Sequence, residues 1–169
     1  MASTTTRALA HCTAGELELA RFALMRDEAA IASSSSSSSS SSEAKLEFAA
    51  LERVVRALWT DDTGDAIETL RSTAWIRSED ATAAEDLIEQ IRFDACHDMA
   101  VAYERFGLDW MGRRLGASEE DARALCATLG WACENGVVRP KVEATIGARR
   151  MDPEEALRTC AEMVARLDA

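Results

Sequence analysis

Hydrophobic residues recur at steps of three and four along most of this chain, which is the spacing of helices that bury one face. The predicted helices cover residues 14–31, 43–59, 63–72, 83–106, 119–129 and 153–167, with a short one at LDWMGRRLG. Only a short stretch near residue 135 departs from this period. The pattern therefore predicts a mainly α-helical fold.

Four of the predicted helix starts carry a capping residue with an acid three positions later, a pattern that satisfies free backbone N–H groups. The pairs are Thr13 with Glu16, Thr82 with Glu85, Ser118 with Asp121, and Asp152 with Glu155. Gly107 and Gly130 follow helical segments, and glycine readily adopts the left-handed conformation that closes many helices. Both glycines are therefore expected to end a helix.

Asn135 and Gly136 stand between two short apolar stretches, which is a strong signal for a tight β-hairpin. Trp131 follows Gly130 directly and is interpreted as the core anchor between the preceding helix and this hairpin. Three helices and a hairpin in this order predict a winged helix.

The organisation predicted from these elements has four parts. Residues 1–82 form a short helical-repeat segment, in which the serine run 33–42 is expected to be a disordered surface loop. Residues 83–141 form the winged-helix subdomain. A linker at 142–151 then leads to a C-terminal interaction helix at 152–169.

Composition narrows the functional classes. The formal net charge is -11 and aromatic residues make up only 5% of the chain. Nucleic-acid binding depends on Lys and Arg that neutralise phosphates, and Glu119, Glu120 and Asp121 would instead point three carboxylates at them. No apolar run approaches 18 residues, so no membrane contact is expected. Five scattered cysteines indicate a reduced, intracellular protein.

The sequence contains few residues in arrangements typical of a catalytic site. A catalytic zinc needs three clustered ligands, and only His11 and His97 are present. No phosphate-binding glycine loop or nucleophile motif is found. Cys126 falls on an apolar stripe and is interpreted as a small core residue. We therefore expect no catalytic residue, no metal and no cofactor.

Three segments, ALWTDDTGDAIETLRSTAW, LIEQIRFDACHDMAVAY and LGASEEDARALCATLGWACENGVVRPK, resemble a known family. It includes the eighth subunit of the COP-nine signalosome, a proteasome regulatory-lid subunit and subunit k of eukaryotic initiation factor three. The matching residues, which span about half the chain, are Trp75, Arg92, Ala102, Tyr103, Leu115, Gly116, Gly130, Trp131, Pro140 and Lys141. The resemblance implies a PCI domain, in which helical repeats run into a winged helix. Structural roles are expected for Trp75, Tyr103 and Leu115, and for the residues around the hairpin.

The signalosome subunit is the most similar of the three, because of its "GW", its strand end and its final helix. This similarity implies a non-catalytic scaffold subunit of the nucleus and cytoplasm, with cullin deneddylation carried out by another subunit. Its partners would be other PCI subunits and, indirectly, cullin-RING ligases, without nucleic acid or membrane. A proteasome-lid or initiation-factor subunit, and a freestanding nucleic-acid-binding winged-helix protein, remain the alternatives.

Two elements are predicted to bind protein partners. Val137, Val138 and Arg139 form the second hairpin strand, where pairing along the sheet edge is a natural mode of binding. The final helix carries an apolar seam spaced by three, four and three residues, the spacing of a coiled-coil contact. Its members are Leu157, Cys160, Val164 and Leu167.

Overall fold

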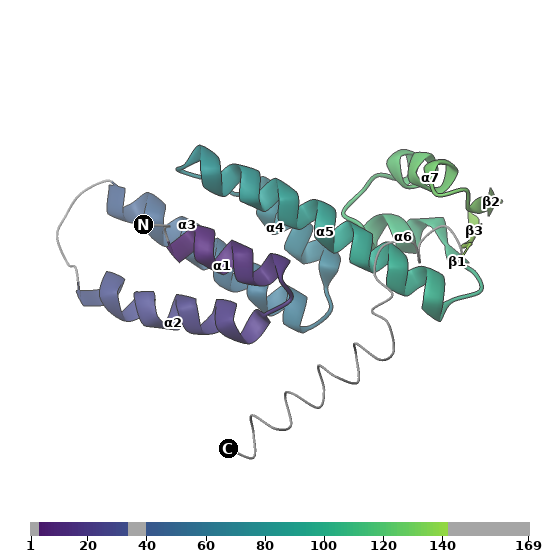
Figure 1. Cartoon of the computed structure of the whole chain (residues 1–169). Helices are drawn as coiled ribbons and strands as arrows, with labels where there is room; N and C mark the ends of the chain where they lie inside the picture. The colour runs from purple at the N-terminus through teal and green to yellow at the C-terminus, as the bar shows by residue number, and fades with distance from the viewer. Residues whose placement is uncertain (1–3, 34–39, 142–169) are drawn as a thin grey trace, which may run out of the picture.

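The computed structural model describes residues 4–33 and 40–141, and within these residues it contains seven helices and one small sheet (Figure 1). The helices and strands are α1 Thr4–Thr13, α2 Leu17–Ser33, α3 Ser40–Trp59, α4 Thr63–Ser72, α5 Ser78–Ala102, β1 Phe106–Gly107, α6 Leu108–Arg114, α7 Glu119–Thr128, β2 Ala132–Glu134 and β3 Val137–Arg139. The predicted mainly α-helical fold is confirmed. No helix in the described ranges is both long and apolar enough to cross a membrane.

The first four helices pack with the N-terminal part of α5 around one hydrophobic core. Fully buried side chains from α1, α3, α4 and α5 meet there, among them Leu9, Leu51, Ile67 and Leu87. Asp80 of α5 is also buried, and its carboxylate accepts a hydrogen bond of 2.6 Å from the Thr6 hydroxyl. This bond satisfies a polar group that would be costly to bury alone.

A second core lies toward the other end of the molecule, where α6, α7 and the strands gather (Figure 1). It begins at Ala95 of α5 and includes Met99, Met111, Leu115 and Val138. Because α5 contributes to both cores, the two groups of elements share one helix. The change from one core to the other falls inside α5, later in the chain than the predicted boundary between residues 82 and 83.

The N-terminal region differs from the prediction of one helix over residues 14–31. A separate helix, α1, precedes it, and Thr13 lies at the end of α1, with its hydroxyl donating to the Leu9 carbonyl. Gly15 and Glu16 then donate backbone hydrogen bonds to Cys12 and His11, which closes α1. Thr13 and Glu16 are therefore part of a helix end, and the predicted cap is wrong.

Helix α5 also has other bounds than predicted. It starts at Ser78, and its N-cap, Arg77, makes no side-chain capping bond, so Thr82 and Glu85 do not mark its start. Its C-cap is Tyr103, in extended conformation. Gly107 has a φ of -75° and precedes α6, so it is not the left-handed end of α5. Residues 106–107 instead form β1, which the sequence pattern did not indicate.

Other local predictions are confirmed. Helix α4 has the predicted bounds, and Ser118 caps α7 by accepting a hydrogen bond from the backbone N–H of Asp121. Helix α7 closes at Gly130, whose φ is +67°.

The serine run 33–42 differs from its prediction as a loop. It is helical at Ser33 and again from Ser40, so a loop across all of it is wrong. The predicted linker and final helix lie outside the described residues.

Candidate functional site

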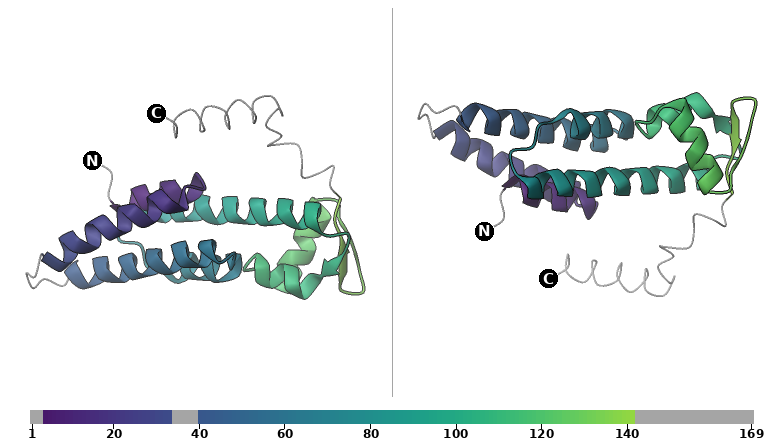
Figure 2. Two further views of the ribbon diagram at one scale, coloured as in Figure 1. Left: turned by 90° about the horizontal axis from the view of Figure 1, so that it is seen from below. Right: turned by 90° about the horizontal axis from the view of Figure 1, so that it is seen from above.

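Strands β2 and β3 form the hairpin that Asn135 and Gly136 predict. Both residues have positive φ, +51° and +77°, as a two-residue turn between twisted strands requires. Glu134 pairs with Val137 across the hairpin. Figure 2 shows this ribbon at the end of the molecule opposite to α2.

The three predicted contact residues of the hairpin have different environments. Strand order is β1-β3-β2, so β3 is the central strand, and Val138 pairs with Phe106 on one side and Cys133 on the other. Val137 and Val138 of β3 therefore offer no free edge to a partner strand, and the predicted sheet-edge pairing through the wing would have to use β2. The Val138 side chain is fully buried, whereas Val137 and Arg139 are exposed. Among the described strands, β2 is the longer of the two outer ones.

A cluster of four aromatic rings joins α5 to the sheet. The Phe106 ring lies 6.0 Å from Trp131, 5.6 Å from Trp110 and 6.3 Å from Tyr103, measured between centroids. Trp131 is buried in the second core, at the position predicted for a helix-to-hairpin anchor. Tyr103 is half exposed. The sequence pattern placed Phe106 at the end of the predicted helix 83–106, which is wrong because Phe106 lies in β1. It did not single out Trp110 of α6.

Charged residues around α6 and α7 do not form a basic surface. Glu119, Glu120 and Asp121 are all exposed in the first turn of α7. The two arginines of α6 pair with acids: Arg113 with Asp109 at 3.3 Å, and Arg114 with Asp61 at 2.7 Å. These pairs remove the local positive charge that phosphate binding would need.

The junction between the two cores is fixed by side chains that bond to the backbone at the end of α6. Arg92 of α5 donates to the carbonyls of Leu115 and Gly116, at 3.0 and 3.4 Å. Arg71 of α4 also donates to Gly116, at 2.6 Å, and Thr63 donates to the Arg114 carbonyl, also at 2.6 Å. Burial, and then the neighbouring Arg71, lower the pKa of Arg92. The two groups of elements therefore meet through directed bonds as well as through the shared helix.

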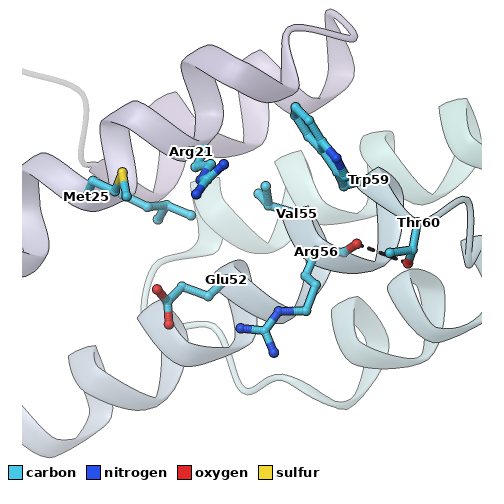
Figure 3. A pocket seen from close by; sticks show the side chains of 8 residues that line it. Arg21, Met25, Glu52, Val55, Arg56, Trp59 and Thr60 are labelled. Atoms are coloured by element: carbon cyan, nitrogen blue, oxygen red, sulfur yellow. Dashed lines mark hydrogen bonds between the residues drawn. The ribbon is translucent and has the colours of Figure 1, made fainter.

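A groove of about 360 Å³ lies between α2 and α3, as Figure 3 shows. Its buried part is formed by Leu24 and Val55, while Met25 and Trp59 line it with 52% of each residue exposed. Arg21, Glu52 and Arg56 supply its charged groups. The groove can therefore accept an apolar side chain between polar walls.

Helix α2 exposes further apolar residues outside this groove. Phe22 and Leu19 are exposed although they are large and apolar. A helix with apolar residues on several sides is usually covered on more than one of them. Phe22 and Met25 fall within the predicted helix 14–31, whose pattern did not indicate that they remain uncovered.

Histidine and cysteine side chains are dispersed. His11 contacts Glu16, with 2.8 Å between Nδ1 and the carboxylate, and His97 is half-buried on α5. Cys126 is a buried core residue, as predicted, with its sulfur 3.5 Å from that of Met111. Among the residues that the structure describes, no three metal-binding side chains come together.

Part of the predicted site lies beyond Lys141. Leu157, Cys160, Val164 and Leu167, with the cap at Asp152, lie outside the described residues. In comparisons with known proteins, neither a family model nor a curated protein matches this chain.

Proposed function

We propose that the chain is a non-catalytic scaffold subunit of the COP-nine signalosome, built on a PCI domain. In this proposal α1 to α4 and the first part of α5 form the helical-repeat segment. The rest of α5, with β1, α6, α7 and the β2–β3 hairpin, forms the winged helix. The chain contributes protein contacts, while another subunit carries out cullin deneddylation in the nucleus and cytoplasm.

One observation carries the proposal: residues of the family resemblance that are distant in sequence bond to each other at the junction. Arg92 donates to the carbonyls of both Leu115 and Gly116, which belong to another quoted segment. Gly130 and Trp131, also in the resemblance, form the turn into the hairpin, where the backbone N–H of Trp131 donates to the Cys126 carbonyl at 2.8 Å. These residues therefore have a common structural reason to occur together.

Protein partners fit this surface better than nucleic acid does. The acidic first turn of α7 would repel phosphates from the helix end that enters a DNA groove in helix-turn-helix proteins. The net charge of -11 acts in the same direction. A strand from a neighbouring PCI subunit could instead extend the sheet at the outer strand β2, with Val137 and Arg139 nearby on the surface.

The full chain, carrying an affinity tag and expressed in its own cells, is the material for the test. We expect the other signalosome subunits to copurify and to be identified by mass spectrometry. Recovery with proteasome lids or with ribosomal initiation complexes would replace this assignment by one of the sibling subunits. Salt-dependent DNA binding without any of these complexes would support a freestanding nucleic-acid-binding protein.

A matched pair of variants tests which surface makes the contact. Val137→Asp places a charge beside the hairpin edge, and Leu46→Asp makes the same kind of change on exposed α3. We expect only Val137→Asp to reduce copurification, because desolvating an unpaired carboxylate at an interface is unfavourable. Equal recovery of the two variants would remove the hairpin from the proposed interface.

A further inference from the structure

The groove between α2 and α3 has apolar walls that no described residue covers. Met25 of α2 and Trp59 of α3 lie at opposite ends of it, and Val55 lies between them (Figure 3). A concave site with apolar walls and a few charged groups is a candidate for binding an apolar side chain. The groove lies on α2 and α3 and includes no residue of the hairpin that the proposed function uses, so it needs an occupant of its own.

The charge around the groove is also incomplete. Arg21 comes from α2 and Arg56 from α3, with Glu52 as the acid that lines the same groove. None of the three forms a salt bridge within the described ranges. The groove therefore carries an excess positive charge in a chain that is otherwise acidic. It favours a helix that has an apolar seam and more acids than bases.

The sequence of the C-terminal segment has these properties. Its seam of Leu157, Cys160, Val164 and Leu167 requires an apolar surface to cover it. Acids exceed bases in residues 153–169: Glu154, Glu155, Glu162 and Asp168, against Arg158 and Arg166. One chain thus contains an uncovered groove and a segment that matches its chemistry.

The chain between them is long enough to connect them. Helix α6 lies between the hairpin and the end of α3. At its first residue, the Leu108 N–H donates to the Gly136 carbonyl of the hairpin. At its last residue, Arg114 bonds to Asp61, just after α3. At 1.5 Å per residue this helix is about 10 Å long. Residues 142–151 can extend over about 33 Å. The linker is therefore about three times as long as the helix that separates the hairpin from the Trp59 end of the groove.

We propose that residues 153–167 dock as an amphipathic helix into the α2–α3 groove of their own chain when the chain is free. The linker holds the segment at an effective concentration in the millimolar range, so a modest affinity keeps the groove covered. This inference concerns the isolated chain and does not depend on membership of any complex.

A photo-crosslinking residue at position 25 of the purified full chain tests the proposal. The matched control replaces Ile76, in the loop before α5, which has the same exposure as Met25, 52%. We expect position 25 to form crosslinks to residues 153–167 within one chain, identified by peptide mass spectrometry, and position 76 to form none. Crosslinks that join two chains, or none to this segment, would overturn the proposal.

A charge exchange provides the second measurement. Arg21→Glu should reduce the crosslinking yield from position 25 by about threefold, because it places an acid opposite the acids of the segment. Adding Glu154→Arg and Glu155→Arg to this variant should restore the yield. Both sites are at polar positions, so the fold is expected to be preserved and can be checked by its helical circular dichroism. A yield that does not respond to either change would contradict the charge pairing and the proposed occupant.

Discussion

Arg92 on α5 donates from Nε to the backbone carbonyl oxygen of Leu115, 3.0 Å away, where α6 has just ended. The last carbonyls of a helix have no partner inside it and carry partial negative charge. The guanidinium therefore satisfies an acceptor and fixes the position of α6 relative to α5.

Arg92→Met should lower the free energy of unfolding by about 1 to 3 kcal/mol, because it removes the charged donor to the Leu115 carbonyl, whereas the Gly116 carbonyl keeps its bond from Arg71. The control is Arg113→Met, which breaks only an exposed pair four residues apart on α6. That change should cost less than about 0.5 kcal/mol. Urea unfolding of both variants measures the difference, and equal midpoints would contradict a structural role for Arg92.

Gly116→Ala should destabilise the chain more than Gly130→Ala does. Both glycines have positive φ, +52° and +67°, where an L residue is disfavoured by roughly 1 to 2 kcal/mol. At Gly116 a Cβ would also lie 2.7 Å from Cγ2 of Ile67, whereas at Gly130 nothing lies within 4 Å. The difference between the two unfolding free energies measures this clash, and its absence would mean that α4 moves away without cost.

Ser118→Ala should cost about 1 kcal/mol, because the Ser118 hydroxyl accepts the hydrogen bond from the Asp121 N–H that caps α7. Thr82→Ala, at a position with the same sequence pattern, should change the unfolding free energy by less than about 0.5 kcal/mol. Thr82 lies within α5, where its hydroxyl bonds only to the carbonyl of Ser78. A larger loss of unfolding free energy in Thr82→Ala would indicate that Thr82 does cap the start of a helix.

The contrast between Ser118 and Thr82 shows what sequence can predict here. Each residue stands three positions before an acid, but only Ser118 follows a segment that has already turned at Gly116. Upstream of Thr82 the chain is already helical from Ser78. A capping pattern identifies a possible start, whereas packing against α1, where Asp80 bonds Thr6, determines the actual one.

The same limit applies to the candidate site. The hairpin was predictable because Asn135 and Gly136 suit positive φ locally. The central position of β3 in the sheet was not predictable from the sequence. It depends on β1, which has only two residues and pairs with β3 about 30 residues later in the chain. The exposure of Met25 and Trp59 was also not predictable, because apolar periodicity does not show which face of a helix lacks a neighbour.

Stability should fall at alkaline pH through Cys12. Burial raises the pKa of the Cys12 thiol from 9.0 to about 12. Above pH 9 the unfolded chain loses this proton while the folded chain keeps it, so the contribution to stability is full below about pH 9 and declines toward pH 12. Unfolding free energies at pH 8 and pH 10 should therefore differ more in the natural chain than in Cys12→Ala. Identical pH dependence in the two would exclude a buried Cys12 thiol.

Val138→Ala and Val137→Ala should separate folding from binding on the central strand. Val138 is fully buried in the second core, so truncating it should cost about 1 to 3 kcal/mol in unfolding free energy. Val137, its neighbour with 40% of its surface exposed, should change that free energy by less than about 1 kcal/mol. Copurification with the proposed partners should show the opposite order. Among folded protein, Val137→Ala should weaken copurification more than Val138→Ala does, while its thermal stability is unchanged. If Val137→Ala instead unfolds the chain as readily as Val138→Ala does, the exposed face of the hairpin is part of the core and is not available to a partner.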